Sequence, residues 1–141
     1  MKTSTLDNTF SLLVRERNNW ACEKCSCFFP EDERVRLHCS HIITRTYRNL
    51  RWHPLNDVAH CAECHRYLTD RPTEFGRWVE NYPRLGPLAA DRLREMAIPI
   101  GKMSAPLMKE IHSNLKTSLE AMRMQRADGV TGRIEFESPY P

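Results

Sequence analysis

The spacing of apolar residues predicts helices at both ends of the chain. Apolar side chains recur every three or four residues in four segments, which are 4–18, 73–82, 87–97 and 106–127. Ser4 or Thr5 can cap the first of these helices. The last residues, 128–141, are expected either to be mobile or to dock as a short strand through Ile134 and Phe136.

The middle of the chain follows a different pattern. Residues 35–43 (VRLHCSHII) have the composition of a strand, 44–56 have that of a loop, and 58–61 form a second short strand candidate. A helix is expected from Cys64 to about Asp70. We therefore predict an α+β fold in which a strand–loop–strand–helix (ββα) unit lies between an N-terminal helix and a helical C-terminal half. The predicted regions are 1–19, 20–72, 73–127 and 128–141.

Six cysteines lie in the first half of the chain, and four of them form two Cys-x-x-Cys pairs, which are Cys22/Cys25 and Cys61/Cys64. A disulfide framework is one interpretation. The N-terminus, however, lacks a secretory signal pattern, and thiols of cytosolic proteins are kept reduced. Two such pairs are the usual way to present four thiolates to one zinc ion. We therefore predict a structural Zn²⁺ site, and we interpret Cys27 and Cys39 as small packing residues.

Composition and charge restrict the class of protein only moderately. The chain has 141 residues, is 40% hydrophobic and has a net charge of +3, which is typical of a soluble globular domain. No stretch reaches the roughly 20 apolar residues that a membrane span needs, and the N-terminus lacks a signal-peptide pattern. We therefore expect a cytoplasmic protein without a membrane partner.

Arginines are concentrated in the same region as the cysteines. Five arginines and no acidic residue lie between Arg34 and Asn56. Guanidinium groups offer a planar set of donors to phosphate oxygens, so this stretch is a candidate for binding a polyanion. A solvated loop whose charge serves solubility is the other interpretation, and the charge pattern alone does not decide between them.

The order of motifs in residues 20–71 resembles that of the HNH (ββα-metal) endonucleases. The resemblance is carried by CEKC, CSHII, LN and CAECH, which supply a cysteine pair, a strand histidine, an asparagine, and a second cysteine pair followed by histidine. Longer segments look like the core of the Rap/NinG-type phage recombination endonucleases. These segments are LVRERNNWACEKC, HCSHIITR, LRWHPLN and HCAECHRYLTDRP.

The resemblance implies a zinc-stabilised ββα-metal core that hydrolyses phosphodiester bonds in DNA with a divalent metal ion. By its position in the motif, His41 corresponds to the general base. A histidine suits this role, since a neutral imidazole accepts a proton from water near neutral pH. Asn56 corresponds to the asparagine that holds the loop and base in register or lies by the metal. His65 corresponds to a ligand of the catalytic ion.

The resemblance leaves the catalytic metal site incomplete. Ser40 occupies the position directly before the base histidine, where many family members have Asp or His as a metal ligand. His65 is then the main protein ligand, and His38 is a candidate second ligand. The ion is expected to be Mg²⁺ or Mn²⁺, and histidine ligation also admits Ni²⁺ or Zn²⁺.

Three arginines of the loop are candidate DNA contacts. Arg45 lies four residues beyond His41 and is the first candidate for binding the scissile phosphate, Arg51 is the second, and Arg48 is a further candidate DNA contact. The substrate implied by the resemblance is DNA, including branched or nicked recombination intermediates, in a bacterium or a phage-infected cell.

Two alternatives stay open at this point. A non-catalytic zinc module that binds nucleic acid or serves phage assembly would keep the cysteines but would not need His41, Asn56 and His65. The apolar stripe of 106–127 is either a seam inside the fold or the interface of a homodimer formed through the C-terminal helices.

Overall fold

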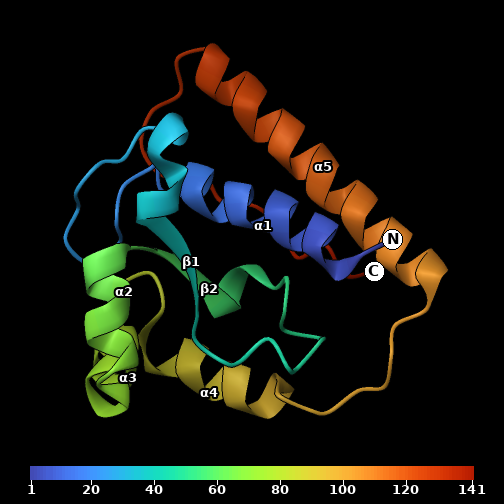
Figure 1. Ribbon diagram of the computed structural model, residues 1–141, viewed down its shortest axis with the longest axis horizontal. Coiled ribbons are helices and arrows are strands. Elements are labelled where there is room, and N and C mark those ends of the chain that lie inside the picture. The colour runs from blue at the N-terminus through green and yellow to red at the C-terminus, as the bar shows by residue number, and fades with distance from the viewer.

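The structure is a computed structural model that describes residues 1–141, and it places a two-stranded sheet among five helices (Figure 1). The helices and strands are α1 (Thr3–Arg17), β1 (Leu37–His41), β2 (Asp57–Cys61), α2 (Ala62–Thr69), α3 (Pro72–Asn81), α4 (Gly86–Met96) and α5 (Ala105–Ala127). Short 3-10 helices, Glu31–Arg36 and Pro54–Asn56, precede the two strands. The fold is α+β, as predicted. None of the helices combines the length and apolar character needed to cross a membrane.

The predicted helices are all present, with ends displaced by one or two residues. The predicted cap of α1 is wrong, because this helix begins after Lys2 and no side chain bonds to its free N–H groups. The helix of the ββα unit begins at Ala62 rather than Cys64. Its earlier start has a physical reason: Cys61 acts as the N-cap, and its sulfur accepts a hydrogen bond from Cys64 N–H.

Strand β1 is shorter than its composition predicts. Val35 is 80% exposed and belongs to the 3-10 helix that precedes the strand. The strand therefore keeps only the residues that find partners in β2. The two strands pair antiparallel, from Leu37 opposite Cys61 to His41 opposite Asp57.

The two faces of the sheet contact different helices, because successive side chains of a strand point to opposite faces. Leu37 and Ala59 belong to the buried apolar cluster that also contains the inner side of α1. His38 and His60 are paired across the strands, and they lie against side chains of α2 and α3, respectively. The sheet is thus enclosed by α1 on one face and by α2 and α3 on the other.

Helix α5 runs diagonally beside α1 in Figure 1 and extends the core away from the sheet. Its buried stripe joins the same apolar cluster as α1 and consists of Ile111, Leu115, Leu119 and Met122. Glu16 near the end of α1 accepts a hydrogen bond from Arg126 of α5 at 3.2 Å. The apolar stripe is therefore an internal seam of the fold, and a homodimer stays a prediction.

The C-terminal tail docks on the core without forming a strand. Ile134 and Phe136 are partly buried against the apolar cluster, so the predicted residues make the contact. The hydroxyl of Tyr140 donates to the carbonyl of Arg48 at 2.6 Å and accepts from the N–H of Trp52 at 3.0 Å. The tail therefore holds the loop that joins β1 to β2.

Substituting Tyr140→Phe is expected to lower the free energy of unfolding by about 1–3 kcal/mol, because it leaves two backbone groups of the loop without their partner. Urea denaturation of the zinc-loaded protein measures this. Tyr47→Phe is the matched control, since this half-buried tyrosine makes no side-chain hydrogen bond, and a change below about 0.5 kcal/mol is expected for it. Equal effects in the two variants would show that the tail does not support the loop.

Candidate metal centre and active site

Four cysteine sulfurs converge at one point although the two pairs are far apart in the sequence. The sulfur atoms of Cys22, Cys25, Cys61 and Cys64 all lie within 4.8 Å of one another. Those of Cys25 and Cys61 are 3.8 Å apart. A tetrahedron with Zn–S distances of about 2.3 Å has sulfurs about 3.8 Å apart. No cysteine forms a disulfide, and the four can hold a structural metal ion such as zinc, as predicted.

The first cysteine pair lies in a tight hairpin. Ala21 and Phe28 form a bridge across the hairpin, and the N–H of Cys22 donates to the carbonyl of Cys27 at 2.9 Å. Ser26 turns the chain with a φ of 66°, in the left-handed region. This turn allows both sulfur atoms of the pair to reach the same cluster.

Glu23, inside the first pair, ties this hairpin to β2. Its N–H donates to the carbonyl of Ala59 at 2.8 Å, and its carboxylate accepts from the N–H of Ala59 at 2.6 Å. Two residues later, Cys61 ends β2, and Cys64 follows in the first turn of α2. The cluster is therefore built from a hairpin, a strand end and a helix start.

The thiols of the cluster need a cation in order to ionise together. Burial raises the pKa of both Cys22 and Cys64 above its ordinary value. Burial also acts to raise the pKa of Cys25, but hydrogen bonds from Cys27 and the neighbouring thiols outweigh it and lower the pKa to about 7. Because the thiolate is the ligand form, metal binding here releases protons and stabilises the fold.

The remaining two cysteines differ from each other. Cys39 packs against the apolar cluster beside α1, as predicted, and its sulfur lies 3.4 Å from a carboxylate oxygen of Asp57. The interpretation of Cys27 as a packing residue is wrong, because the hairpin turn leaves this side chain exposed.

His41 lies against a buried carboxylate. It ends β1 opposite Asp57, and its Nδ1 is 2.5 Å from Oδ1 of Asp57. The Asp57 side chain is fully buried, whereas that of His41 is 28% exposed and so accessible from solvent. Burial raises the pKa of Asp57, and the neighbouring His41 opposes this. A carboxylate beside Nδ1 favours the tautomer with the proton there, so Nε2 is free to accept a proton.

His38 and His65 form a second histidine pair. Their Nδ1 atoms are 2.9 Å apart. Nε2 of His38 lies 3.1 Å from the carbonyl of Val35, which can only accept, so Nε2 carries a proton and, in the neutral ring, Nδ1 carries a lone pair. Burial lowers the pKa of His65, and His38 and His41 lower it further. The structure thus brings the two predicted metal-ligand histidines together, with His41 near enough to act on His65.

Asn56 is fully buried and its amide closes the loop between the strands. Its side-chain oxygen accepts from Ile43 N–H at 2.7 Å, and its Nδ2 donates to the carbonyls of Ile43 and Leu50 at 2.9 and 3.2 Å. All of these partners are backbone groups of the loop. Of the two predicted roles, this geometry favours holding the loop in register over lying by a metal.

The three loop arginines predicted to contact DNA are in different situations. Arg45 and Arg48 have exposed side chains. The guanidinium of Arg51 instead makes two hydrogen bonds to Asp7 of α1, at 2.9 and 2.7 Å. Arg51 is therefore committed to a contact inside the chain, and Arg45 and Arg48 are the arginines of this set that are open to a ligand.

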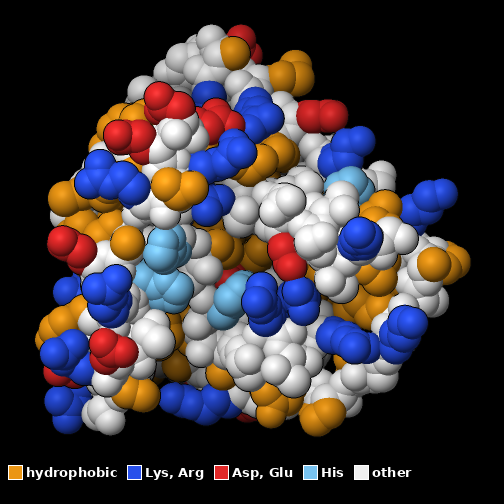
Figure 2. Space-filling model, in the orientation of Figure 1, with side chains coloured by type: hydrophobic (Ala, Val, Ile, Leu, Met, Phe, Trp, Pro, Cys, Tyr) orange, Lys and Arg blue, Asp and Glu red, His pale blue; other side chains and the backbone are white.

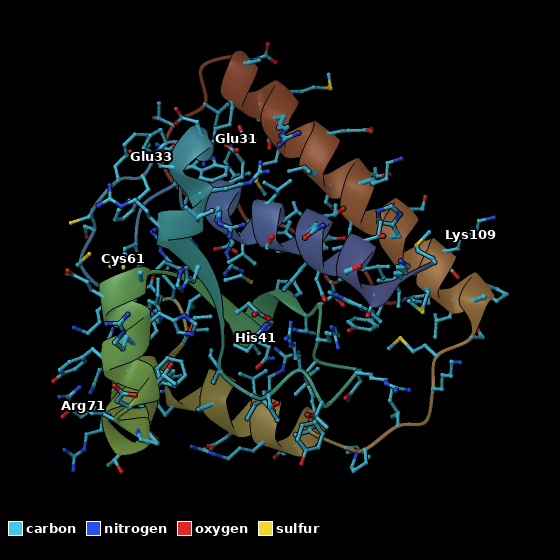
Figure 3. All side chains as sticks on the ribbon, viewed as in Figure 1. Glu31, Glu33, His41, Cys61, Arg71 and Lys109 are labelled. Atoms are coloured by element: carbon cyan, nitrogen blue, oxygen red, sulfur yellow. The ribbon has the colours of Figure 1, made fainter.

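Histidine side chains gather around a hollow on the face shown in Figure 2, and Lys and Arg side chains lie beside it. His41 is in the middle of this face, between α1 and α4, whereas Cys61 lies at the upper end of α2 (Figure 3). The candidate catalytic histidine and the cysteine cluster thus occupy separate positions in one module. The cysteine cluster joins the hairpin to the corner between β2 and α2, whereas His38, His41 and His65 are partly exposed to solvent.

Two acidic residues of this region, Asp57 and Glu23, are not singled out by the sequence motifs. Asp57 directly follows Asn56, and the only signal for it is an acidic residue at the start of a short apolar strand. Glu23 is hidden inside a cysteine pair, where a charged side chain is usually exposed. Both residues are buried, and their partners come from distant parts of the chain. Asp57 contacts His41, and Glu23 accepts hydrogen bonds from Tyr82 and Arg133.

Comparisons with protein-family models, curated proteins and solved structures found no match for this chain.

We predict one zinc ion per chain, and Cys25→Ser is expected to lose it and to unfold residues 20–72. Structural zinc contributes on the order of 10 kcal/mol to small modules of this kind. Elemental analysis and circular dichroism of the purified variant measure both effects. Cys27→Ser is the control, because this exposed side chain is not one of the four ligands and serine keeps a hydroxyl that can replace its hydrogen bond to Cys25. A folded wild-type protein without metal would contradict the prediction.

Proposed function

We propose that this protein is a metal-dependent endonuclease of the HNH type that hydrolyses phosphodiester bonds in DNA. The observation that carries the proposal is the pair formed by solvent-accessible His41 and buried Asp57, whose Nδ1 and Oδ1 atoms are 2.5 Å apart. This pair lies beside the pair formed by His38 and His65. A module that only bound nucleic acid would need neither pair.

His41 acts as the general base in the proposed reaction. Its Nε2 takes a proton from a water molecule, whose oxygen then bonds to phosphorus while the bond from phosphorus to the 3′ oxygen breaks. Asp57 orients the imidazole and stabilises the imidazolium that forms, in the way a buried carboxylate serves a catalytic histidine. Asn56 keeps the loop, and with it the end of β1, in place through its three backbone contacts.

His38 and His65 suit a divalent ion. Two imidazole nitrogens bound to one metal at about 2.0–2.1 Å lie about 3 Å apart, and the two Nδ1 atoms are 2.9 Å apart. The Val35 carbonyl fixes the tautomer of His38 that leaves Nδ1 available, as carbonyls do for metal-ligating histidines. A divalent ion such as Mg²⁺, Mn²⁺, Ni²⁺ or Zn²⁺ would supply stabilisation of the charge that develops on the phosphate.

Arg45 and Arg48 are the proposed contacts to the phosphates of DNA. Both are exposed on the loop that begins directly after His41, and arginine donates in a geometry that matches phosphate oxygens. The proposed setting is DNA recombination or processing in a bacterial cell or a phage-infected one. Branched, nicked and linear DNA are the substrates to compare.

His41→Ala is expected to lower the rate of plasmid nicking by about 10²–10⁴-fold, because the general base is removed. Nicking with added Mg²⁺ or Mn²⁺ measures this, and a panel of branched, nicked and linear DNAs defines the substrate. His112→Ala, a histidine of α5 whose ring contacts Thr9, should keep full activity. If wild type and His41→Ala are equally inactive with Mg²⁺, Mn²⁺, Ni²⁺ and Zn²⁺ while both bind DNA, the protein is a non-catalytic binding module.

Asp57→Asn separates orientation of the His41 ring from stabilisation of its imidazolium form. The amide can hold the ring but does not stabilise the imidazolium, so kcat is expected to fall while KM changes little. The pH–rate profile of this variant should shift relative to wild type. An unchanged kcat and profile would show that Asp57 serves only the packing of β2.

His65→Ala is expected to keep the structural zinc but to lose metal-dependent cleavage, because the cysteine cluster does not include His65. Elemental analysis gives the zinc content, and titration of nicking activity with Mn²⁺ gives the metal dependence. Wild-type activity at the same Mn²⁺ concentration would mean that the catalytic metal site is wrongly assigned.

A further inference from the structure

A cavity lined by several arginines lies apart from the two histidine pairs. Its volume is about 250 Å³, and its lining is drawn from the carboxyl end of α1, the segment 53–58, the turn before α4, α4 itself, and the C-terminal tail. None of the histidines of the candidate active site lines it. The residues that matter for its chemistry are Arg17, Arg84, Arg92, Arg133 and His53.

Arg17 forms the buried side of this cavity. The residue is 2% exposed. Its NH1 donates to the carbonyl of Pro54 at 2.8 Å and its NH2 to the carbonyl of Asp57 at 2.5 Å. Its Nε is buried and has no hydrogen-bond partner. A buried N–H of a guanidinium without an acceptor is costly, so Arg17 brings an unsatisfied donor and a positive charge to the wall of the cavity.

Arg84 and Arg92 form the open side. Both side chains are exposed, and neither makes an ion pair with an acidic side chain, whereas Arg94 of α4 does. Leu85, between Arg84 and the start of α4, also lines the cavity, and it caps α4 without any side-chain hydrogen bond. The uncapped amino end of an 11-residue helix, which favours anions, therefore borders the cavity.

The charges around the cavity do not balance. Two carboxylates are present: buried Glu23 pairs with both Arg17 and Arg133, and Glu135 pairs with Arg133. Four guanidinium groups therefore face two carboxylates, and the unpaired ones belong to Arg84 and Arg92. The pKa of His53, which also lines the cavity, is lowered mainly by burial and further by the positive charge of Arg92.

We infer that this cavity binds a phosphate-type anion through Arg17, Arg84 and Arg92. The cavity is smaller than the 300–1,000 Å³ typical of sites for drug-sized ligands, so it suits a phosphate group rather than a large organic molecule. Guanidinium donors converging from three elements match the several oxygens of phosphate. The phosphate can come from free inorganic phosphate or from the 5′ end of a DNA strand, and the chemistry is the same.

The test uses the zinc-loaded full chain without added divalent metal, so that it does not depend on cleavage. Titration calorimetry with inorganic phosphate compares wild type with Arg84→Gln/Arg92→Gln, which leaves the structural bonds of Arg17 and Arg133 intact. The dissociation constant is expected to rise about tenfold or more, as loss of a charge-assisted hydrogen bond predicts. Arg77→Gln/Lys116→Gln removes the same charge from exposed positions outside the cavity and should change it less than about twofold.

A second arm identifies the source of the phosphate. A fluorescent single-stranded oligonucleotide is compared with and without a 5′-phosphate. If the 5′-phosphate strengthens binding to wild type but not to the Arg84/Arg92 variant, the ligand is a DNA end; if only inorganic phosphate distinguishes the variants, the ligand is the free anion. The inference is wrong if wild type binds neither probe saturably, or if both double variants lose binding equally. Inactivity in the nicking assay leaves these results unaffected.

Discussion

The convergence of four thiols at one point is the constraint on which the rest of this structure depends. Cys22 and Cys25 lie in a hairpin, and Cys61 and Cys64 lie at the corner between β2 and α2, so the two pairs have no local reason to meet. A two-stranded sheet of five residues per strand is too small to be stable alone. A metal ion bound by the four sulfurs would offset that deficit, because its binding energy would become folding energy.

Buried charge connects this cluster to the rest of the module. Glu23 bonds to the backbone of β2, to Tyr82 after α3 and to Arg133 in the tail. Arg17 bonds to the backbone on either side of Asn56, at Pro54 and Asp57. Most of the polar atoms of these two buried side chains have partners from distant segments, and the Nε of Arg17 is the exception. The start of β2, where Asp57 faces His41, is consequently held from several directions.

The proposed chemistry depends on this rigidity. His41 and His38 belong to one strand, and their partners Asp57 and His65 come from the next strand and from α2. Each pair therefore spans two elements: strand pairing places β1 beside β2, and the cysteine cluster lies at the corner where β2 continues into α2. Arg17 connects the arginine-lined cavity to this site, since it both borders the cavity and donates a hydrogen bond to the backbone carbonyl of Asp57. A phosphate bound there and one held near His41 would be placed by the same buried group.

The sequence by itself determined the helices, the α+β class, the four cysteines that come together and the histidines that meet in the fold, because periodicity, cysteine spacing and motif order are read directly from the chain. Only the tertiary structure decided that Asp57 partners His41, that Asn56 holds the loop, that Arg51 is occupied by Asp7 and that Cys27 is exposed. These facts depend on strand register and on burial. Both arise from contacts between residues far apart in sequence, which no local pattern encodes.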